Sequence, residues 1–269
     1  MKAAIDHSQT VLLVTGGTKG IGLATALAFA RHGARSILTY RWGSADEGEV
    51  KKAFRDVGGP EPWMVEADVA NKDETDALAR KIRERYGRVD VFVSNASASL
   101  LVNDLDDYTE RGFFQSLRAS AWPTFEYLQA FRRHLERLPR HVVIMSSDGP
   151  DRFTNAYDFV AASKATLETL MRYWQFRVAD QPVNINVLRS RAVRTDSFDS
   201  TFGSEFYGFL RRFVDDAWFM SQEEIADAAL ALASGFFDGV RGQVITVDRG
   251  STFGDGISYL YAERERRLL

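Results

Sequence analysis

Short apolar runs alternate with stretches of helical periodicity along most of the chain, and this alternation restricts the fold more than any other feature of the sequence. The runs are rich in β-branched residues and are bounded by glycine or charged residues, which is typical of buried strands. Seven of them are expected to form strands: Thr10–Gly16, Arg35–Tyr40, Glu61–Val69, Arg88–Asn95, Arg140–Ser147, Val183–Leu188 and Gln243–Asp248.

Helical patterns fill the intervals between these runs. Alternation of this kind predicts an α/β fold, a Rossmann-like doubly wound parallel sheet of about seven strands with helices on both faces. Without a repeat or a linker, we expect a single domain over residues 1–269. Pro123 requires one helical stretch to kink or to restart. The expected helices are Ile21–Gly33, Ser44–Val57, Asn71–Tyr86, Leu105–Leu138 as one helix or two, Asn155–Val178 and Ser221–Ser234.

Composition and charge exclude several classes of function. A net charge of −3 gives no electrostatic reason to expect nucleic acid or an anionic membrane as a partner. The chain has no cysteine, so it offers no disulfide, thiolate metal site or cysteine nucleophile, and its histidines show no metal-binding spacing. No apolar run approaches the roughly 18 residues of a spanning helix. We therefore expect a cytoplasmic protein.

A glycine-rich turn, "VTGGTKGIG" over Val14–Gly22, joins the first expected strand to the first expected helix. Glycine at positions 16, 20 and 22 would let the backbone turn tightly and approach a pyrophosphate at the positive end of the helix. A tight turn needs glycine for its own sake, but the strand before it and the helix after it favour a dinucleotide site.

The end of the second expected strand indicates which dinucleotide binds. NAD-binding chains usually carry an acidic residue there, whereas this chain has Arg41 with no carboxylate nearby in the sequence. Lys19 adds a second positive charge within the glycine turn. Two cations would attract a ribose 2′-phosphate, so we predict NADP(H). The alternative is that Arg41 is a solvated surface charge.

Two C-terminal segments depart from the regular alternation. Residues 197–220 are rich in aromatic side chains, which could fill a core or line a lid over an apolar ligand. We predict a substrate lid there and a C-terminal extension over 251–269, whose end is either a short amphipathic helix or a solvated tail. The aromatic residues are Phe198, Phe202, Phe206, Tyr207, Phe209, Phe213, Trp218 and Phe219.

The sequence motifs, taken together and in their order along the chain, resemble those of the short-chain dehydrogenase/reductase family over roughly Thr10–Gly250. The glycine turn resembles its cofactor turn, Asp68–Val69 its adenine contact, and "SNAS" at Ser94–Ser97 its Asn-Ala-Gly segment. The resemblance implies a homo-dimer or homo-tetramer formed through the two long helical regions. It also implies these cofactor-binding residues: Gly16, Thr18, Lys19, Gly20, Ile21, Gly22, Arg41, Asp68, Val69, Asn95, Ala96, Lys164, Val193 and Thr195.

The catalytic residues implied by the resemblance are Tyr157, Lys164 and Ser147. Ser147 lies 17 residues before Lys164, the usual family spacing, but the tyrosine lies seven residues before the lysine instead of four. This spacing resembles the enoyl-acyl-carrier-protein reductase branch, as does Ser120 where ketoreductases carry asparagine. Residues seven apart in a helix lie nearly on one face, so we expect both side chains to reach one site.

Three residues depart from the family pattern: Ser97 and Arg249 replace usual glycines, and Arg191 follows Ser190 where a glycine-containing pair is usual. Arg191 could narrow the pocket or bind an anionic substrate group.

The resemblance implies an NADPH-dependent reductase of an enoyl thioester on a carrier protein or coenzyme A. Two alternatives stay open: a reductase of another C=O, C=N or C=C bond in secondary metabolism, and a catalytically silent NADP(H)-binding protein.

Overall fold

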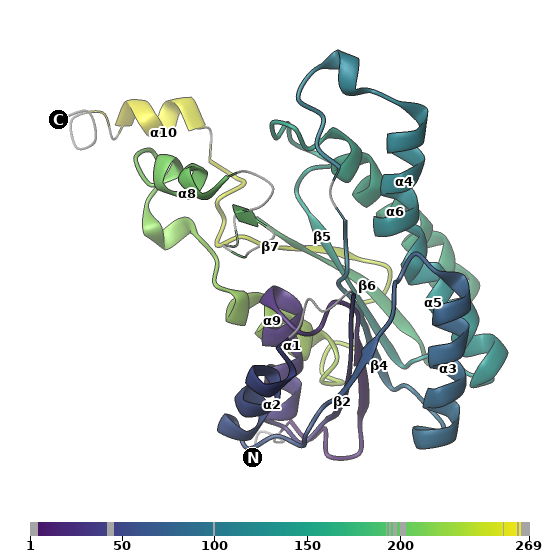
Figure 1. Ribbon diagram of the computed structural model, residues 1–269. Coiled ribbons are helices and arrows are strands. Elements are labelled where there is room, and N and C mark those ends of the chain that lie inside the picture. The colour runs from purple at the N-terminus through teal and green to yellow at the C-terminus, as the bar shows by residue number, and fades with distance from the viewer. Residues whose placement is uncertain are drawn as a thin grey trace.

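The computed structural model describes residues 5–41, 46–98, 100–191, 193, 195, 198–199, 203–254, 256–262 and 264. Seven parallel strands form one sheet in the order β3-β2-β1-β4-β5-β6-β7, with helices on both sides (Figure 1). The predicted α/β fold is confirmed. The strands are β1 (Val11–Val14), β2 (Arg35–Tyr40), β3 (Trp63–Glu66), β4 (Val91–Ser94), β5 (His141–Ser147), β6 (Asn184–Ser190) and β7 (Val244–Val247).

The helices follow the predicted intervals, with different ends. The stretch 105–138 is divided, as Pro123 required, because that proline lies in the first turn of α5. The predicted start of the second helix, Ser44, lies outside the described residues. The helices are α1 (Gly20–Ala30), α2 (Glu47–Asp56), α3 (Lys72–Tyr86), η1 (Leu105–Asp107), α4 (Glu110–Ser120), α5 (Trp122–His134), α6 (Asp158–Arg177), α8 (Ser204–Leu210), η2 (Asp216–Trp218), α9 (Gln222–Leu232) and α10 (Gly256–Ala262).

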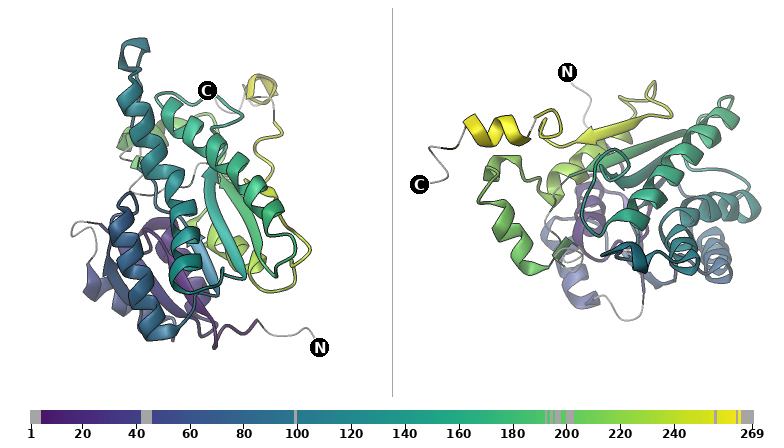
Figure 2. Two further views of the ribbon diagram at one scale, coloured as in Figure 1. Left: turned by 90° about the vertical axis from the view of Figure 1, so that its right-hand side faces the viewer. Right: turned by 90° about the horizontal axis from the view of Figure 1, so that it is seen from above.

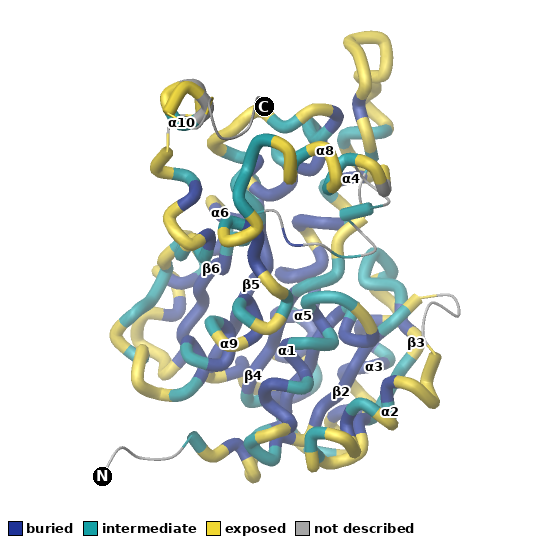
Figure 3. Tube along the Cα trace, turned by 90° about the vertical axis from the view of Figure 1, so that its left-hand side faces the viewer, coloured by how far each residue is buried: buried dark blue, intermediate teal, exposed yellow. Residues whose placement is uncertain are grey.

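Side chains of each strand alternate between two apolar layers. In β1, Val11 and Leu13 pack with α3, α5 and α6, whereas Leu12 and Val14 pack with α1, α2 and α9. The left view of Figure 2 faces the layer of α3 to α6. Figure 3 shows the central strands buried between the two layers. Because both faces are covered, only the strand ends are open to a ligand.

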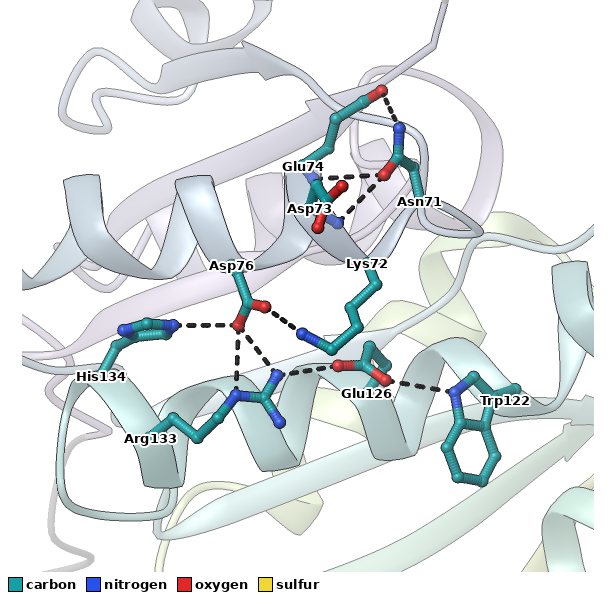
Figure 4. A network of polar contacts seen from close by, with 9 residues as sticks. All are labelled: Asn71, Lys72, Asp73, Glu74, Asp76, Trp122, Glu126, Arg133 and His134. Atoms are coloured by element: carbon teal, nitrogen blue, oxygen red, sulfur yellow. Dashed lines mark hydrogen bonds and ion pairs between the residues drawn. The ribbon is translucent and has the colours of Figure 1, made fainter.

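A polar network joins α3 to α5 on the first of these layers (Figure 4). The carboxylate of Asp76 accepts hydrogen bonds from Arg133 at 2.8 Å and from His134 at 2.9 Å, and it also pairs with Lys72. Arg133 donates a further bond to Glu126 at 2.8 Å. Burial alone would raise the pKa of Asp76, but these donors outweigh it and hold the pKa well below its usual range.

Replacing Asp76 with asparagine should lower the free energy of unfolding by about 3 kcal/mol at neutral pH, because the cations around it lose their shared anion. Urea denaturation followed by circular dichroism would measure the loss. Glu84→Gln is the matched control, since Glu84 is an exposed carboxylate of the same helix. Equal losses in the two variants would show that the network contributes nothing specific.

The same network predicts the pH dependence of stability. The folded-state pKa of Asp76 is depressed, so the carboxylate contributes fully to the free energy of unfolding above its unfolded pKa of about 4. This contribution is lost as pH falls below that value. The difference between the wild-type protein and Asp76→Asn should therefore be constant above about pH 5 and shrink below about pH 4.

Candidate active site

A cavity of about 1200 Å³ opens at the carboxyl ends of the strands. It spans the point between β1 and β4 where the strand order reverses, the usual ligand position in such sheets. Its wall contains all the predicted site residues except Gly22: Gly16, Thr18, Lys19, Gly20, Ile21, Arg41, Asp68, Val69, Asn95, Ala96, Ser147, Tyr157, Lys164, Val193 and Thr195.

The glycine turn has the shape that a pyrophosphate requires. Gly16 and Gly20 adopt positive φ angles of 61° and 56°, which residues with a side chain rarely adopt. Gly22 lies buried beneath the turn, where a Cβ atom would stand 2.3 Å from the carbonyl oxygen of Gly16 and 2.6 Å from Nδ2 of Asn95. These glycines leave an open cradle at the start of α1, so the residues present fit a dinucleotide.

Asn95 braces this turn from the end of β4. Its side-chain amide donates to the carbonyl oxygens of Thr15 at 3.0 Å and of Gly16 at 3.1 Å. In return, the Thr15 hydroxyl accepts bonds from the backbone N–H groups of Asn95 and Ala96 at 3.0 and 3.1 Å. Asn95 was predicted to bind the cofactor, and these contacts give its amide a supporting position within the cofactor turn.

Ser120, the residue aligned with the family asparagine, has a similar supporting position at the end of α4. Its hydroxyl donates to the carbonyl of Ala98 at 2.9 Å and accepts from the Ser97 hydroxyl at 2.9 Å. The backbone N–H of Ala98 also donates to it, at 3.2 Å. Ser120 and the unusual Ser97 together fasten the segment that follows β4.

Arg41 has no carboxylate nearby in the sequence, but one lies beside it in the structure. Nε of Arg41 lies 3.2 Å from Oδ2 of Asp68. The two residues follow β2 and β3, which are neighbours in the sheet, so residues distant in sequence meet at one edge. The charge of Arg41 is therefore shared with the carboxylate that was predicted to contact the adenine.

The prediction that Tyr157 lies within a helix is wrong. Helix α6 begins at Asp158, and Tyr157 precedes it as the N-cap residue with φ −103° and ψ 7°. Its carbonyl accepts the first helical bond, from Ala161 at 2.8 Å. Its side chain nevertheless lines the same cavity as Lys164, so the two meet through the helix start and not through helical periodicity.

The ring of Tyr157 packs against a glycine of the preceding loop. A Cβ atom at Gly149 would lie 2.9 Å from Cδ1 and Cε1 of the tyrosine, so no larger residue fits with the ring in this position. Burial raises the pKa of Tyr157, and the charge of Asp148 adds to the rise, while the nearby Ser147 hydroxyl opposes it. The phenol is therefore held in its protonated form, in which it can donate a hydrogen bond.

Lys164 is buried, and its ammonium group donates to the carbonyl of Met145 at 2.9 Å. Burial lowers the pKa of Lys164 to about 8, although the negative charge of Glu168 works against the change. The lysine thus changes charge within the range of an ordinary enzyme assay.

This pKa predicts how turnover depends on pH. The lysine is protonated below about pH 8 and neutral above it, so kcat/KM should fall as pH rises through that value. Steady-state rates in buffers of overlapping pH range would measure this decrease in kcat/KM. Lys164→Arg, which keeps its charge at every assay pH, should abolish the decrease. An unchanged decrease in this variant would assign the ionisation to another group.

A buried ion pair between Arg189 and Glu168 was not predicted from the sequence. Arg189 donates two bonds to Glu168, at 2.8 and 2.6 Å, and Ser146 donates a third at 2.7 Å. Arg189 also pairs with Asp151. A glutamate on a helix is usually interpreted as a solvent-exposed charge. The feature of the sequence that could have indicated a buried role is the position of Glu168, one turn after Lys164. The pair ties the loop after β5 to α6 and β6.

Arg191 and Arg249, the two arginines that depart from the family pattern, both form ion pairs within the protein. Nε of Arg191 lies 3.4 Å from Oδ2 of Asp148, so the residue expected to bind an anionic substrate group pairs with a carboxylate of the protein. Arg249 has a positive φ of 54°, the conformation that explains the usual glycine at this position. Its guanidinium donates to Glu224 at 2.8 Å and to the carbonyl of Ala217 at 2.7 Å.

The aromatic segment lies against the cavity. Four of its side chains, Phe198, Phe206, Trp218 and Phe219, line the wall. Tyr207 packs on Phe219 with ring centroids 4.7 Å apart. The segment is therefore neither a closed core nor a solvated loop. Ser197 and Phe202, which belong to the predicted lid, lie outside the described residues.

Comparison with known proteins agrees with this geometry. A family model described as Enoyl-(Acyl carrier protein) reductase matches residues 16–252. The chain belongs to the short-chain dehydrogenase/reductase family. Its members are oxidoreductases that use a nicotinamide cofactor, and the predicted family membership is confirmed.

Relatives in the family act on different substrates. The chain is 28% identical to 1-cyclohexenylcarbonyl-CoA reductase of Streptomyces collinus, over 91% of this chain and 87% of that protein. It is 31% identical to the short-chain dehydrogenase/reductase FrzI of Cladobotryum sp, over 68% of this chain and 70% of the relative. A solved variant of actinorhodin polyketide ketoreductase with NADPH shares the fold, with a TM-score of 0.81, 21% identity, and coverage of 91% and 98%.

Two further properties of the described residues bear on other functions. None of their helices combines the length and apolar character needed to cross a membrane. Among the same residues, no group of three or more histidine and acidic side chains is arranged to hold a metal ion.

Proposed function

We propose that this protein is an NADPH-dependent reductase of the C=C bond in an enoyl thioester, carried by coenzyme A or a carrier protein. The observation that supports it most is the seven-residue separation of Tyr157 and Lys164 together with their place in one cavity beside Ser147. Family membership establishes only the coarser function, reduction or oxidation with a nicotinamide cofactor.

The position of charge in the reaction explains why a displaced tyrosine suits this substrate. When bound, the cofactor supplies a hydride. In a ketone, negative charge appears on the oxygen attached to the reduced carbon. In an enoyl thioester it appears on the thioester oxygen, remote from the β-carbon. A donor for that enolate must therefore stand farther from the reduced carbon, and the tyrosine of this chain has moved by nearly one helical turn in sequence.

The chain's own groups can perform the remaining steps. Hydride addition to the β-carbon leaves an enolate. Tyr157, kept protonated by burial, donates a hydrogen bond and then its proton to the enolate oxygen. The enol that results tautomerises to the saturated thioester, and the phenolate regains a proton from solvent. Lys164 would hold the nicotinamide ribose, and its positive charge favours the anion that develops nearby. Ser147 lies beside Tyr157 in the wall and orients the phenol or the substrate carbonyl. The lid over 197–220 excludes water from these groups.

The cofactor preference follows from Lys19 and Arg41, which both line the cavity near the glycine turn. Arg41→Ala should weaken NADPH binding by tenfold or more and leave NADH binding nearly unchanged, because only NADPH carries the 2′-phosphate. Fluorescence titration would measure both constants. Arg35→Ala, at the opposite end of β2, is the matched control. Equal affinities for NADH and NADPH in the wild-type protein would contradict the preference.

A reductase of a C=O bond is the second candidate. It is supported by Ser147 and Lys164, which keep the spacing of ordinary ketoreductases, and by the polar Asp148–Arg191 pair in the cavity wall. A ketone oxygen could reach these groups without involving the displaced tyrosine.

One assay separates the candidates. Oxidation of NADPH is followed by absorbance with a series of enoyl thioesters and, in parallel, with the matching β-ketoacyl thioesters. Turnover of the enoyl series alone supports the proposal. Turnover of the β-ketoacyl series alone supports the second candidate. Tight NADPH binding without turnover of either series would contradict both candidates and leave a reductase of another kind of substrate or a catalytically silent cofactor-binding protein.

We also propose a homo-dimer or homo-tetramer. Aromatic side chains on the helices expected to form the interface are exposed, among them Trp122 at 48% and Phe176 at 85%. Covering them with a second copy would remove apolar surface from water. Sedimentation velocity would give the assembly size.

A further inference from the structure

The C-terminal segment turns back over the active site after β7. The carboxylate of Asp248 accepts bonds from the backbone N–H groups of Gly250 at 3.0 Å and of Thr252 at 2.8 Å, which form the turn. Ser251 is consequently buried and lines the cavity. Helix α10 follows this turn, and Figure 1 draws it at the same end of the molecule as α8.

Two arginines from the active-site loops fasten this segment. Arg191, which follows β6, donates to the carbonyl of Ser251 at 3.0 Å. Arg152, in the loop between β5 and α6, donates to the carbonyl of Thr252. The segment is thus held by the loop between β5 and α6, which carries Asp148 and Tyr157, and by the loop after β6, which carries Arg191. It is part of the site rather than a solvated tail.

One side chain of α10 reaches the cavity. Tyr259 is half-buried, whereas the other residues of α10 whose side chains the structure describes are exposed. Its ring lies 5.2 Å from that of Trp218, at 45°. Its hydroxyl lies 3.4 Å from Oδ2 of Asp215, and the Trp218 ring also packs against Gly254. Tyr259 and Trp218 form a continuous wall between the C-terminal segment and the lid.

The wall of the cavity is rich in aromatic side chains. Flat rings in such a wall favour another ring by offset or edge contacts, in addition to the apolar area that is buried. A linear chain gains only the area and loses more rotational freedom on binding. Besides Tyr40 and Tyr157, the aromatic residues that line the cavity are Phe153, Phe198, Phe206, Trp218, Phe219 and Tyr259.

We propose that Tyr259, through its contact with Trp218, is a specificity-determining residue that selects a ring-bearing acyl group over a linear one of equal carbon number. The substrate class inferred is a thioester whose double bond lies in or next to a carbocyclic ring. This inference rests on the proposed function for its chemistry, but not for the binding preference.

The test compares two coenzyme A thioesters with equal numbers of acyl carbons, 1-cyclohexenylcarbonyl-CoA and the straight-chain enoyl-CoA. The wild-type protein should prefer the ring in kcat/KM. Tyr259→Ala should reduce that preference about fivefold to tenfold, mainly through the KM of the ring substrate. Tyr259→Phe should keep the preference. Tyr261→Ala, a change in an exposed tyrosine of the same helix, should leave it unaltered.

An equal preference in Tyr259→Ala and Tyr261→Ala would overturn the inference. If neither thioester is reduced, the proposed function fails while the inference is still tested by calorimetric binding of both thioesters in the presence of NADPH. Selective binding of the ring that is lost in Tyr259→Ala would support it. Equal binding of ring and chain by the wild-type protein would overturn it.

Discussion

Replacing Tyr157 with phenylalanine should lower kcat for enoyl thioesters by a factor of about 100 or more, with little change in NADPH affinity. The substitution removes one hydroxyl and keeps the ring that fills the space beside Gly149. The enolate oxygen then loses its protonated donor in a buried site, where such a bond contributes most. Stopped-flow measurement of a single turnover would separate this chemical step from product release.

Tyr173→Phe is the matched control for this experiment, because Tyr173 is an exposed tyrosine of α6, the helix that Tyr157 precedes. A Tyr157→Phe variant as active as the wild-type protein would make the tyrosine a bystander and remove the main support for enoyl reduction. Loss of NADPH binding in that variant would instead indicate a role in the cofactor site.

Gly22→Ala should weaken NADPH binding by a factor of about 100 or more and reduce turnover in proportion. The new methyl group would stand 2.3 Å from the Gly16 carbonyl, a distance that backbone atoms cannot accept. Relief of the clash must open the turn and break the bond from Asn95 to Gly16, so the cradle for the pyrophosphate is lost. Fluorescence titration with NADPH would measure the change.

Gly239→Ala serves as the control, since a Cβ atom at Gly239 meets nothing within 4 Å. It should bind NADPH as the wild-type protein does. Thermal unfolding of both variants distinguishes a damaged turn from a damaged fold. Unchanged NADPH affinity in Gly22→Ala would show that the glycine turn does not hold the cofactor.

Local patterns were sufficient to predict the sheet and most of its helices, because burial on both faces produces apolar runs and Pro123 marks a helix start. The start of α6 was predicted three residues too early. The segment before Asp158 has no strong helix breaker, and the positive φ of 61° at Ala156 that ends the preceding loop has no signature in an alanine.

The site was predicted as a set of residues but not as a set of contacts. The glycine spacing and the Tyr157–Lys164 pair could be predicted from the sequence because each belongs to one short stretch of chain, the turn before α1 or the start of α6. Arg41 with Asp68, and Arg189 with Glu168, join side chains from separate βα units. Nothing in either residue's neighbourhood specifies its partner, so such pairs appear only after the strand order is known.

The contacts of Arg152 and Arg191 with the backbone of Ser251 and Thr252 have a practical consequence. A fusion tag attached at the C-terminus would disturb a segment that is hydrogen-bonded to the loops after β5 and β6. Affinity handles, fluorescent reporters and surface-immobilisation linkers belong at the other terminus. Ile5 there accepts a bond from His32 after α1, away from the strand ends that hold the cavity.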